Sequence, residues 1–276
     1  MTRPGASATP PLSGSSAAPG VGGWDDAAVS APAMSLGRPC WIDITVTNAD
    51  DRERLVAFLV EVFGWTFEAS GPDMGYYTML RQDGADVAAV GQQETGGGRW
   101  VTFLSTPDIE DSARRVRAAG GTVFVEPMAI MRAGSMALAL DPVGAVFGLW
   151  QPDLFAGFPD VIAPGCPEWF HHGSQDPDTA SRFYAEAFDL RVIPADGDSM
   201  VGRDGRGYFS LGRNIPGNAP DLRPVILVGD LDEVEARIAR AGGEIYASRV
   251  EVPGGFATTF ADPVVGAPLI VSVNAA

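Results

Sequence analysis

The stretch "LALDPVGAVFGLW" at residues 138–150 reads as two short apolar strands joined by a tight turn. Pro142 presets the backbone φ angle and Gly144 accepts the left-handed conformation, so "DPVG" favours a turn between the strands. The segment "TTFADPVVGAPLIV" at 258–271 has the same pattern, with its Asp-Pro pair 121 residues further along the chain. A strand–turn–strand unit that recurs at this distance indicates an internal repeat.

Two further segments support the repeat, because each has a counterpart in the second half of the chain. The pairs are "LVAFLVEVFGW" (55–65) with "ASRFYAEAFDL" (180–190), and "SARRVRAAGGTV" (112–123) with "VEARIARAGGEI" (234–245). Phe58 and Phe183 are 125 residues apart, and Gly120 and Gly242 are 122 residues apart. Three landmarks at nearly one offset predict two homologous domains in a single chain.

The predicted domains are 39–151 and 166–274, joined by the linker "PDLFAGFPDVIAPG" at 152–165. Residues 1–36 are rich in Ala, Gly, Ser and Pro, which bury too little apolar surface to offset the entropy of ordering a chain. We expect a disordered leader there. Met34 is then an alternative start to Met1, because the ordered pattern begins at "GRPCWIDITV".

Each domain carries a twofold pattern of its own. In the first domain the predicted elements are strand 40–46, helix 51–62, strands 65–68, 76–80 and 86–90, strand 100–104, helix 109–119, and strands 122–126, 135–140 and 146–150. This order, βαβββ twice per domain, predicts an α+β chain of four modules. The second domain has "GRNIPGNAPD" in place of a clear counterpart of strand 86–90, so we expect its cavity to be shallower or open towards a partner.

The helix ends of the type F-x-x-x-x-FGW, FY-x-x-x-F and A-x-x-AGG, together with "DPVGAVFGLW", carry a family resemblance. The chain resembles the vicinal oxygen chelate superfamily, the glyoxalase and bleomycin-resistance-like proteins, over nearly everything after residue 38. The resemblance implies two tandem glyoxalase-like domains, each of two βαβββ modules that form an open barrel around a small-molecule cavity. It also implies a tandem actinobacterial type, which includes auxiliary proteins of anthracycline and other polyketide pathways.

Metal-dependent members of the family place a His on the first strand, a second ligand on the first strand of the next module, and a Glu on the last strand. Counting back seven residues from Asp176, which starts a helix, gives Trp169, with Trp41 as its counterpart in the first domain. The remaining positions fall on Trp100 and Gly148 in the first domain and on Arg223 and Ile270 in the second. None of these residues is an ordinary metal ligand, so we expect no metal and no cofactor.

Both histidines of the chain lie in "WFHHGSQD". Neighbouring strand residues point to opposite faces of a sheet, so His171 and His172 cannot bind one ion together. Because Trp169 and His171 share a face, we expect His171 to point into the barrel and His172 into the outer layer. Asp43 stands beside Trp41 in the same way. For Asp43 and His171 two interpretations stay open, an acid, base or ligand contact and a satisfied polar group on a half-buried strand.

Aromatic side chains replace the metal ligands that the resemblance implies. Flat rings with a few polar groups suit a flat, partly apolar ligand, and each ring contact adds roughly 0.5–1.5 kcal/mol beyond burial. The alternative for each tryptophan is an ordinary place in the core. Arg223 is either an anion or carbonyl donor in the cavity or a rim residue. The predicted ligand-binding residues are Trp41, Asp43, Tyr77, Trp100, Trp150, Trp169, His171, Phe209, Arg223 and Phe256.

The formal net charge is −16, and all 19 basic residues are arginines. Such a chain repels phosphate backbones and anionic lipid, which argues against nucleic-acid and membrane partners. No apolar run approaches the roughly 20 residues needed to span a bilayer, and the first residues lack a secretory pattern, so we expect a cytoplasmic protein. Cys40 and Cys166 are too few for a disulfide framework and are expected to be reduced.

The leading hypothesis is metal-independent binding of an aromatic small molecule, an antibiotic or polyketide, for sequestration, resistance or assistance to a biosynthetic enzyme. The alternative is a metal-free isomerase, cyclase or hydroxylase that uses His171 or Asp43 as acid or base. The resemblance adds a biosynthetic oxygenase as a protein partner. Four modules can complete their barrels within one chain or between two, so monomer and homodimer both stay open.

Overall fold

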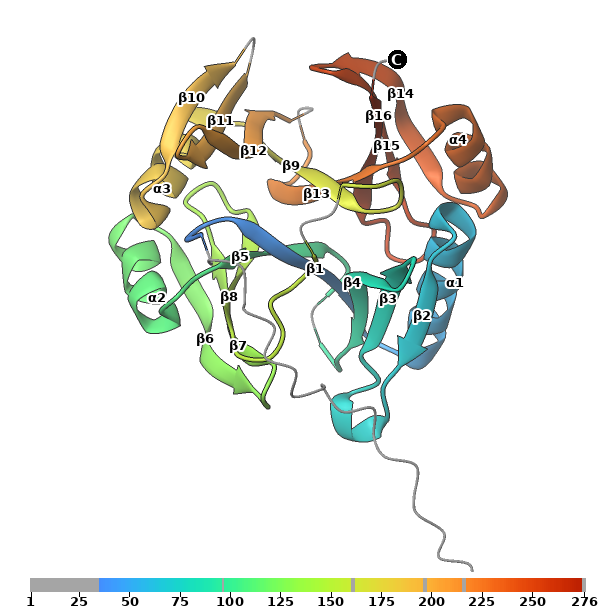
Figure 1. Ribbon diagram of the computed structural model, residues 1–276, viewed down its shortest axis with the longest axis horizontal. Coiled ribbons are helices and arrows are strands. Elements are labelled where there is room, and N and C mark those ends of the chain that lie inside the picture. Colours follow the sequence, from blue (N-terminus) through green and yellow to red (C-terminus); the bar gives the residue numbers. More distant parts are fainter. Residues whose placement is uncertain (1–34, 96, 160–161, 196–197, 215–216, 275–276) are drawn as a thin grey trace, which may run out of the picture. The chain divides into compact units, whose positions relative to one another are not determined.

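The computed structural model describes residues 35–274 except 96, 160–161, 196–197 and 215–216, so nearly all of the predicted leader lies outside the described residues. Within them the order βαβββ occurs four times (Figure 1). The first half contains β1 (Pro39–Val46), α1 (Ala49–Phe63), β2 (Thr66–Ala69), the short 3-10 helix η1 (Pro72–Met74), β3 (Thr78–Gln82), β4 (Ala85–Gln92), β5 (Trp100–Ser105), α2 (Ile109–Ala118), β6 (Thr122–Ile130), β7 (Gly134–Leu140) and β8 (Val146–Pro152). The second half contains β9 (Pro167–Ser174), α3 (Pro177–Phe188), β10 (Arg191–Ala195), β11 (Asp198–Arg203), β12 (Arg206–Arg213), β13 (Asp221–Leu227), α4 (Leu231–Arg240), β14 (Glu244–Val252), β15 (Gly255–Ala261) and β16 (Pro268–Asn274).

Each half forms one eight-stranded sheet. The strand order is β2-β3-β4-β1-β5-β8-β7-β6 in the first sheet and β10-β11-β12-β9-β13-β16-β15-β14 in the second. In both sheets the first strand of one module pairs antiparallel with the first strand of the next, as β1 does with β5. Edge strands remain at both ends, so each sheet is an open barrel. The predicted pairing of four βαβββ modules is confirmed.

The expectation that the second half lacks a counterpart of strand 86–90 is wrong. β12 pairs in parallel with β9, as β4 does with β1. The strand is formed by "RGYFSLGR", and the Gly- and Asn-rich segment begins at its end. Those turn-forming residues obscured the strand in the sequence, because it ends where they begin.

Polar side chains determine where the helices and turns begin. Asn48, Asp108, Asp176 and Asp230 each accept a hydrogen bond from a backbone N–H in the first turn of a helix. In the turn after β7, Asp141 accepts from the backbone N–H groups of Val143 and Ala145. Asp262 does the same in the matching turn after β15. The two Asp-Pro turns are therefore stabilised by their own carboxylates.

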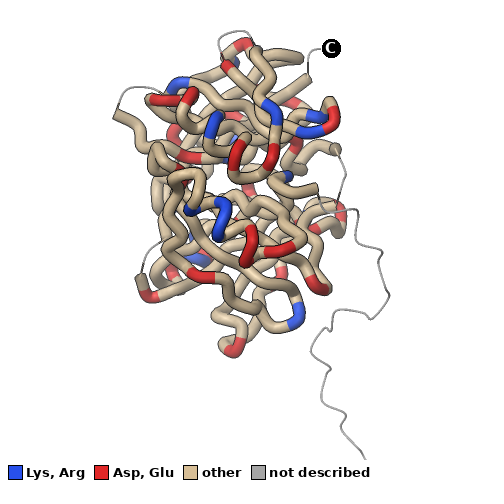
Figure 2. Tube along the Cα trace, turned by 90° about the vertical axis from the view of Figure 1, so that its left-hand side faces the viewer, with Lys and Arg blue, Asp and Glu red and all other residues tan. Residues whose placement is uncertain are grey.

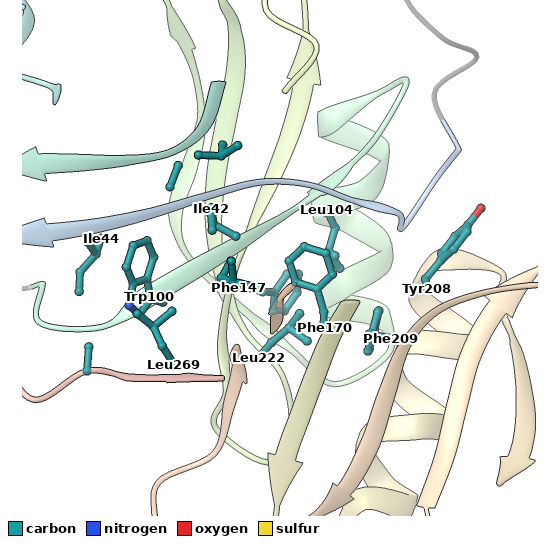
Figure 3. Packing of buried hydrophobic residues seen from close by; sticks show 14 of the residues in the cluster. Ile42, Ile44, Trp100, Leu104, Phe147, Phe170, Tyr208, Phe209, Leu222 and Leu269 are labelled. Atoms are coloured by element: carbon teal, nitrogen blue, oxygen red, sulfur yellow. The ribbon is translucent and has the colours of Figure 1, made fainter. Parts of the chain in front are cut away.

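Alternation along the strands gives each sheet two faces. We call the face that carries Trp41 and Asp43, or Trp169 and His171, the inner face, and the opposite one the core face. The core faces of the two sheets share one buried apolar cluster with the helices. Figure 3 shows part of this shared core, including Ile42, Ile44, Trp100, Leu104, Phe147, Phe170, Phe209, Leu222 and Leu269.

Contacts between the halves join the two core faces. Thr102 Oγ1 of β5 donates to the carbonyl oxygen of Leu222 in β13 at 2.8 Å. α2 packs against α3, and α1 against α4. The inner faces carry separate side-chain clusters, so any site on them belongs to one half.

Acidic and basic residues are scattered over the described chain (Figure 2). None of the helices that the structure describes is long and apolar enough to cross a membrane.

Candidate functional site

Three side chains on the inner face of the first sheet form a chain of hydrogen bonds. Trp41 donates its indole N–H to the Tyr77 hydroxyl at 2.9 Å, and that hydroxyl donates to Asp43 Oδ2 at 3.1 Å. Burial raises the pKa of Asp43 to about 7, and the hydrogen bond from Tyr77 opposes the rise. Tyr76, by contrast, is 42% exposed, so Tyr77 is the tyrosine that faces inward.

Aromatic side chains of the linker cover this network. The Phe155 ring lies edge-on to Trp41 with centroids 4.8 Å apart, and the Phe158 ring lies 6.1 Å from the same indole. Trp150 donates its indole N–H to the carbonyl oxygen of Phe155 at 2.8 Å. Trp41 and Trp150 are only 4% and 8% exposed. On the first sheet the tryptophans therefore belong to a packed cluster.

The equivalent residues of the second sheet remain partly exposed. Trp169 and His171 take the register positions of Trp41 and Asp43, and both are half-buried. Ser210 of β12 contacts both, accepting the Trp169 indole N–H at 3.1 Å and lying 3.0 Å from His171 Nδ1. Burial, and then the nearby Arg223 and His172, lower the pKa of His171 to about 4. Its imidazole is thus neutral at physiological pH.

Arg223 lies directly opposite His171 in the strand pair β9–β13. Its guanidinium donates from Nε and Nη2 to Asp221 Oδ1, at 3.0 and 2.6 Å, and from Nη2 to Asn214 Oδ1 at 3.1 Å. The residue is 8% exposed. Of the two interpretations of Arg223, the rim residue is wrong, because the structure holds the charge in place beside the histidine.

Three predicted ligand-binding residues lie on other faces, contrary to the sequence analysis. Trp100 is the register partner of Ile44 and packs in the shared core (Figure 3). Phe209 is fully buried in the same core. Phe256 is 38% exposed on the face that α4 covers, with the Arg249 guanidinium 5.7 Å from its ring centroid. The sequence pattern within a single strand could not predict the face on which these rings lie, because that depends on the register between strands.

The donor set of the inner faces does not fit the metal that the family resemblance implies. In the first sheet a Cβ on Gly148 would lie 2.1 Å from the Phe103 ring, so this position is filled. In the second sheet Ile270 and Val225 are register partners at the same place. Across the described part of the chain, no group of three or more His, Cys, Asp or Glu side chains could hold a metal ion.

His172 lies on the core face, as strand alternation predicts. Its Nε2 is 2.7 Å from Asp141 Oδ2, which also accepts the Tyr184 hydroxyl at 3.2 Å. All three side chains are buried between the halves, so the second histidine joins the core and not the candidate site.

Sequence reasoning missed two polar residues of the second inner face. Ser210 is the register partner of His171, and only recognition of β12 as a strand could have found it. Glu168 forms a hydrogen bond with Ser272 beside a register shift between β9 and β13. No sequence signal predicted that irregularity, since it depends on the pairing of two distant strands.

Two hollows of the described structure lie away from these residues. One, of about 400 Å³, is lined by residues of α1 such as Phe58 and by Pro263 in the turn after β15. The other, of about 210 Å³, lies beside Gln82 and Arg237. Neither is lined by a predicted site residue.

Comparison with known proteins agrees with the fold. Residues 43–150 match the family described as Glyoxalase-like domain. The first half therefore contains a glyoxalase-like domain, and the described chain has the vicinal oxygen chelate fold.

Its relatives include proteins of similar length. It is 29% identical to the anthracycline biosynthesis protein DauV of Streptomyces sp. (strain C5), over 82% of this chain and 90% of that protein. It is 28% identical to the putative glyoxylase CFP32 of Mycobacterium tuberculosis, over 82% and 91%. The Mn(II)-bound glyoxalase from Novosphingobium aromaticivorans superposes with a TM-score of 0.63 at 15% identity, over 87% of this chain and 82% of that one. The last similarity shows the fold alone.

Proposed function

We propose that this protein binds a planar aromatic small molecule of natural-product metabolism on the inner face of the second sheet, without a metal. The observation that carries the proposal is the half-buried Trp169 indole, oriented by Ser210 beside neutral His171 and charged Arg223. A flat apolar ring next to a few fixed polar groups suits a flat ligand with polar atoms at its edge.

The packing of the first sheet supports placing the ligand on the second half of the chain. Its inner face is covered by Phe155 and Phe158 of the linker, so the chain itself supplies the aromatic groups there. The similarity to an anthracycline biosynthesis protein supports a ligand of that general kind. Binding would serve sequestration, resistance or assistance to a biosynthetic enzyme. The predicted oxygenase partner, cytoplasmic location and choice between monomer and homodimer stay predictions.

Tryptophan-fluorescence titration with a panel of planar aromatic polyketides tests the proposal. We expect saturable quenching, and a loss of affinity of about two- to tenfold in Trp169→Leu, since a stacked ring contributes roughly 0.5–1.5 kcal/mol beyond its burial. Phe256→Leu is the matched control, because this ring lies on the opposite face of the same sheet. The absence of both quenching and a thermal shift with every compound would contradict the proposal.

A second candidate function is acid–base catalysis at the first sheet. A specific observation favours it: the pKa of Asp43 is raised to about 7, where a carboxylate is well matched to move protons at neutral pH. A substrate would reach Asp43 only if the linker moved away from Trp41. This function predicts product formation that Asp43→Asn abolishes while ligand affinity survives. Saturable binding without product would favour the first function.

A further inference from the structure

On the inner face of the second sheet, Arg223 and His171 each have a hydrogen-bond donor that no other described residue accepts. The Trp169 indole can only donate, so Ser210 Oγ accepts its N–H at 3.1 Å. The Ser210 proton then has two acceptors, His171 Nδ1 at 3.0 Å and the Phe170 carbonyl oxygen at 3.4 Å. We assign the proton to the shorter contact, with Nδ1. The neutral ring of His171 therefore carries its proton on Nε2.

The guanidinium of Arg223 is only partly satisfied. Asp221 accepts from Nε and Nη2, and Asn214 accepts from Nη2. Asp221 therefore covers the edge formed by Nε and Nη2, and Asn214 accepts the remaining hydrogen of Nη2, so the hydrogens of Nη1 are the ones that no described residue accepts. Among the described residues, neither Nη1 of Arg223 nor Nε2 of His171 has a hydrogen-bond partner, and neither is one of the fully buried atoms that lack one.

The two donors belong to register partners on adjacent strands. Side chains directly opposite each other on one face lie roughly 5 Å apart at their Cβ atoms, close enough for one acceptor atom to meet both. The charged and titratable groups around them are Asp221, which pairs with Arg223; Arg99 and His172, which act on Asp221 electrostatically; and Glu168, which forms a hydrogen bond with Ser272. A neutral imidazole N–H and a guanidinium both favour an acceptor that carries negative charge.

We propose that the second inner face selects aromatic ligands with an ionised ring hydroxyl, a phenolate, whose oxygen accepts from Arg223 Nη1 and His171 Nε2 while the ring packs on Trp169. This inference rests on the proposed function and specifies the chemistry of its ligand. The phenolate oxygen binds beside Arg223 and His171 without any metal.

A pair of matched probes tests the proposal on the full-length protein. 2-Hydroxyanthraquinone changes its visible absorption on ionisation, and 2-methoxyanthraquinone has the same ring but cannot ionise. We expect the bound hydroxy probe to be ionised at a pH about one unit below that of the free probe, which corresponds to tenfold tighter binding of the phenolate. The methoxy probe should bind more weakly, to the same face.

Variants assign the effect to the two donors. Arg223→Gln combined with Asp221→Asn removes the ion pair as a unit, which avoids leaving one buried charge alone. We expect it to abolish the ionisation shift and weaken binding of the hydroxy probe about tenfold, with less than a twofold effect on the methoxy probe. His171→Phe should give a smaller loss of the same kind, and Arg249→Gln, on the opposite face, should change neither probe.

The outcomes separate the two proposals. Binding of both probes with equal affinity and no ionisation shift overturns the phenolate assignment and leaves the proposed function standing. Failure of both probes to bind overturns the two together. A shift that persists in the double variant also overturns the assignment, because the positive charge would then come from elsewhere.

Discussion

Asp43 and His171 stand at equivalent positions on the two sheets, and burial moves their pKa values in opposite directions. The pKa of the carboxyl group rises to about 7 and the pKa of the imidazole falls to about 4. In both cases a half-buried strand face penalises the charged form. At the scale of the residue, one cause therefore favours the neutral form of each group.

The raised pKa of Asp43 predicts a pH dependence of stability. The folded form binds the proton more tightly than the unfolded chain, whose pKa is near 3.8. Stability from this group is therefore lost as pH rises from about 4 to about 7, and is constant above that range. The wild type should lose this stability between pH 5 and pH 8 and Asp43→Asn should not. The free energy of unfolding of Asp43→Asn, relative to the wild type, should therefore rise by about 1–3 kcal/mol from pH 5 to pH 8.

Urea unfolding of both proteins at the two pH values measures this change, and the other carboxylates cancel in the comparison. Asp73→Asn, on the exposed η1, is the control and should show no such change. A free-energy difference between Asp43→Asn and wild type that is the same at pH 5 and pH 8 would contradict the raised pKa.

At the scale of the element, the pairing of β5 and β8 places a large side chain opposite a glycine. Phe103 is the register partner of Gly148, and its ring fills the space that a side chain there would need. The same ring packs in the cluster of Trp41 and Trp150. The missing side chain on β8 thus allows the aromatic cluster of the first inner face to form.

This packing predicts that Gly148→Ala is destabilising. The new Cβ would lie 2.1 Å from Phe103, and overpacking of this kind costs roughly 1–3 kcal/mol. Chemical denaturation of the single and double variants tests it: Phe103→Leu added to Gly148→Ala should restore part of the loss, because the two sites couple. Gly229→Ala, whose Cβ would meet nothing within 4 Å, is the control. Purely additive changes in the free energy of unfolding would show that the Phe103 ring is not what opposes a side chain at position 148.

At the scale of the whole molecule, the link between Asp141 and His172 joins the two halves through a buried polar cluster. Both side chains are fully buried, and Tyr184 donates to the same carboxylate oxygen. Among the described residues, the matching turn residue Asp262 accepts hydrogen bonds only from backbone N–H groups of its own turn. One Asp-Pro turn therefore has a second role that its repeat lacks.

This asymmetry predicts different costs for the same substitution. Asp141→Asn should destabilise by roughly 3–5 kcal/mol, because it leaves buried groups of the opposite half without their acceptor. Asp262→Asn should lose only about 1–2 kcal/mol, the cost of weakened turn hydrogen bonds. Thermal or urea unfolding compares the two variants directly. Equal losses would mean that the contact with His172 contributes nothing to stability.

The sequence by itself determined the features that depend on neighbours along the chain. The repeat, the four modules, the Asp-Pro turns and the shared faces of Trp41 with Asp43 and of Trp169 with His171 all follow from local periodicity and turn chemistry. Only the tertiary structure decided which strands lie in register, and hence that Trp100, Phe209 and Phe256 face away from the candidate site. It also decided that the linker covers one inner face and leaves the other partly exposed. The physical reason is that pairing between distant strands, and the burial it brings, depends on the packing of the whole chain and leaves no periodic signal in a single segment.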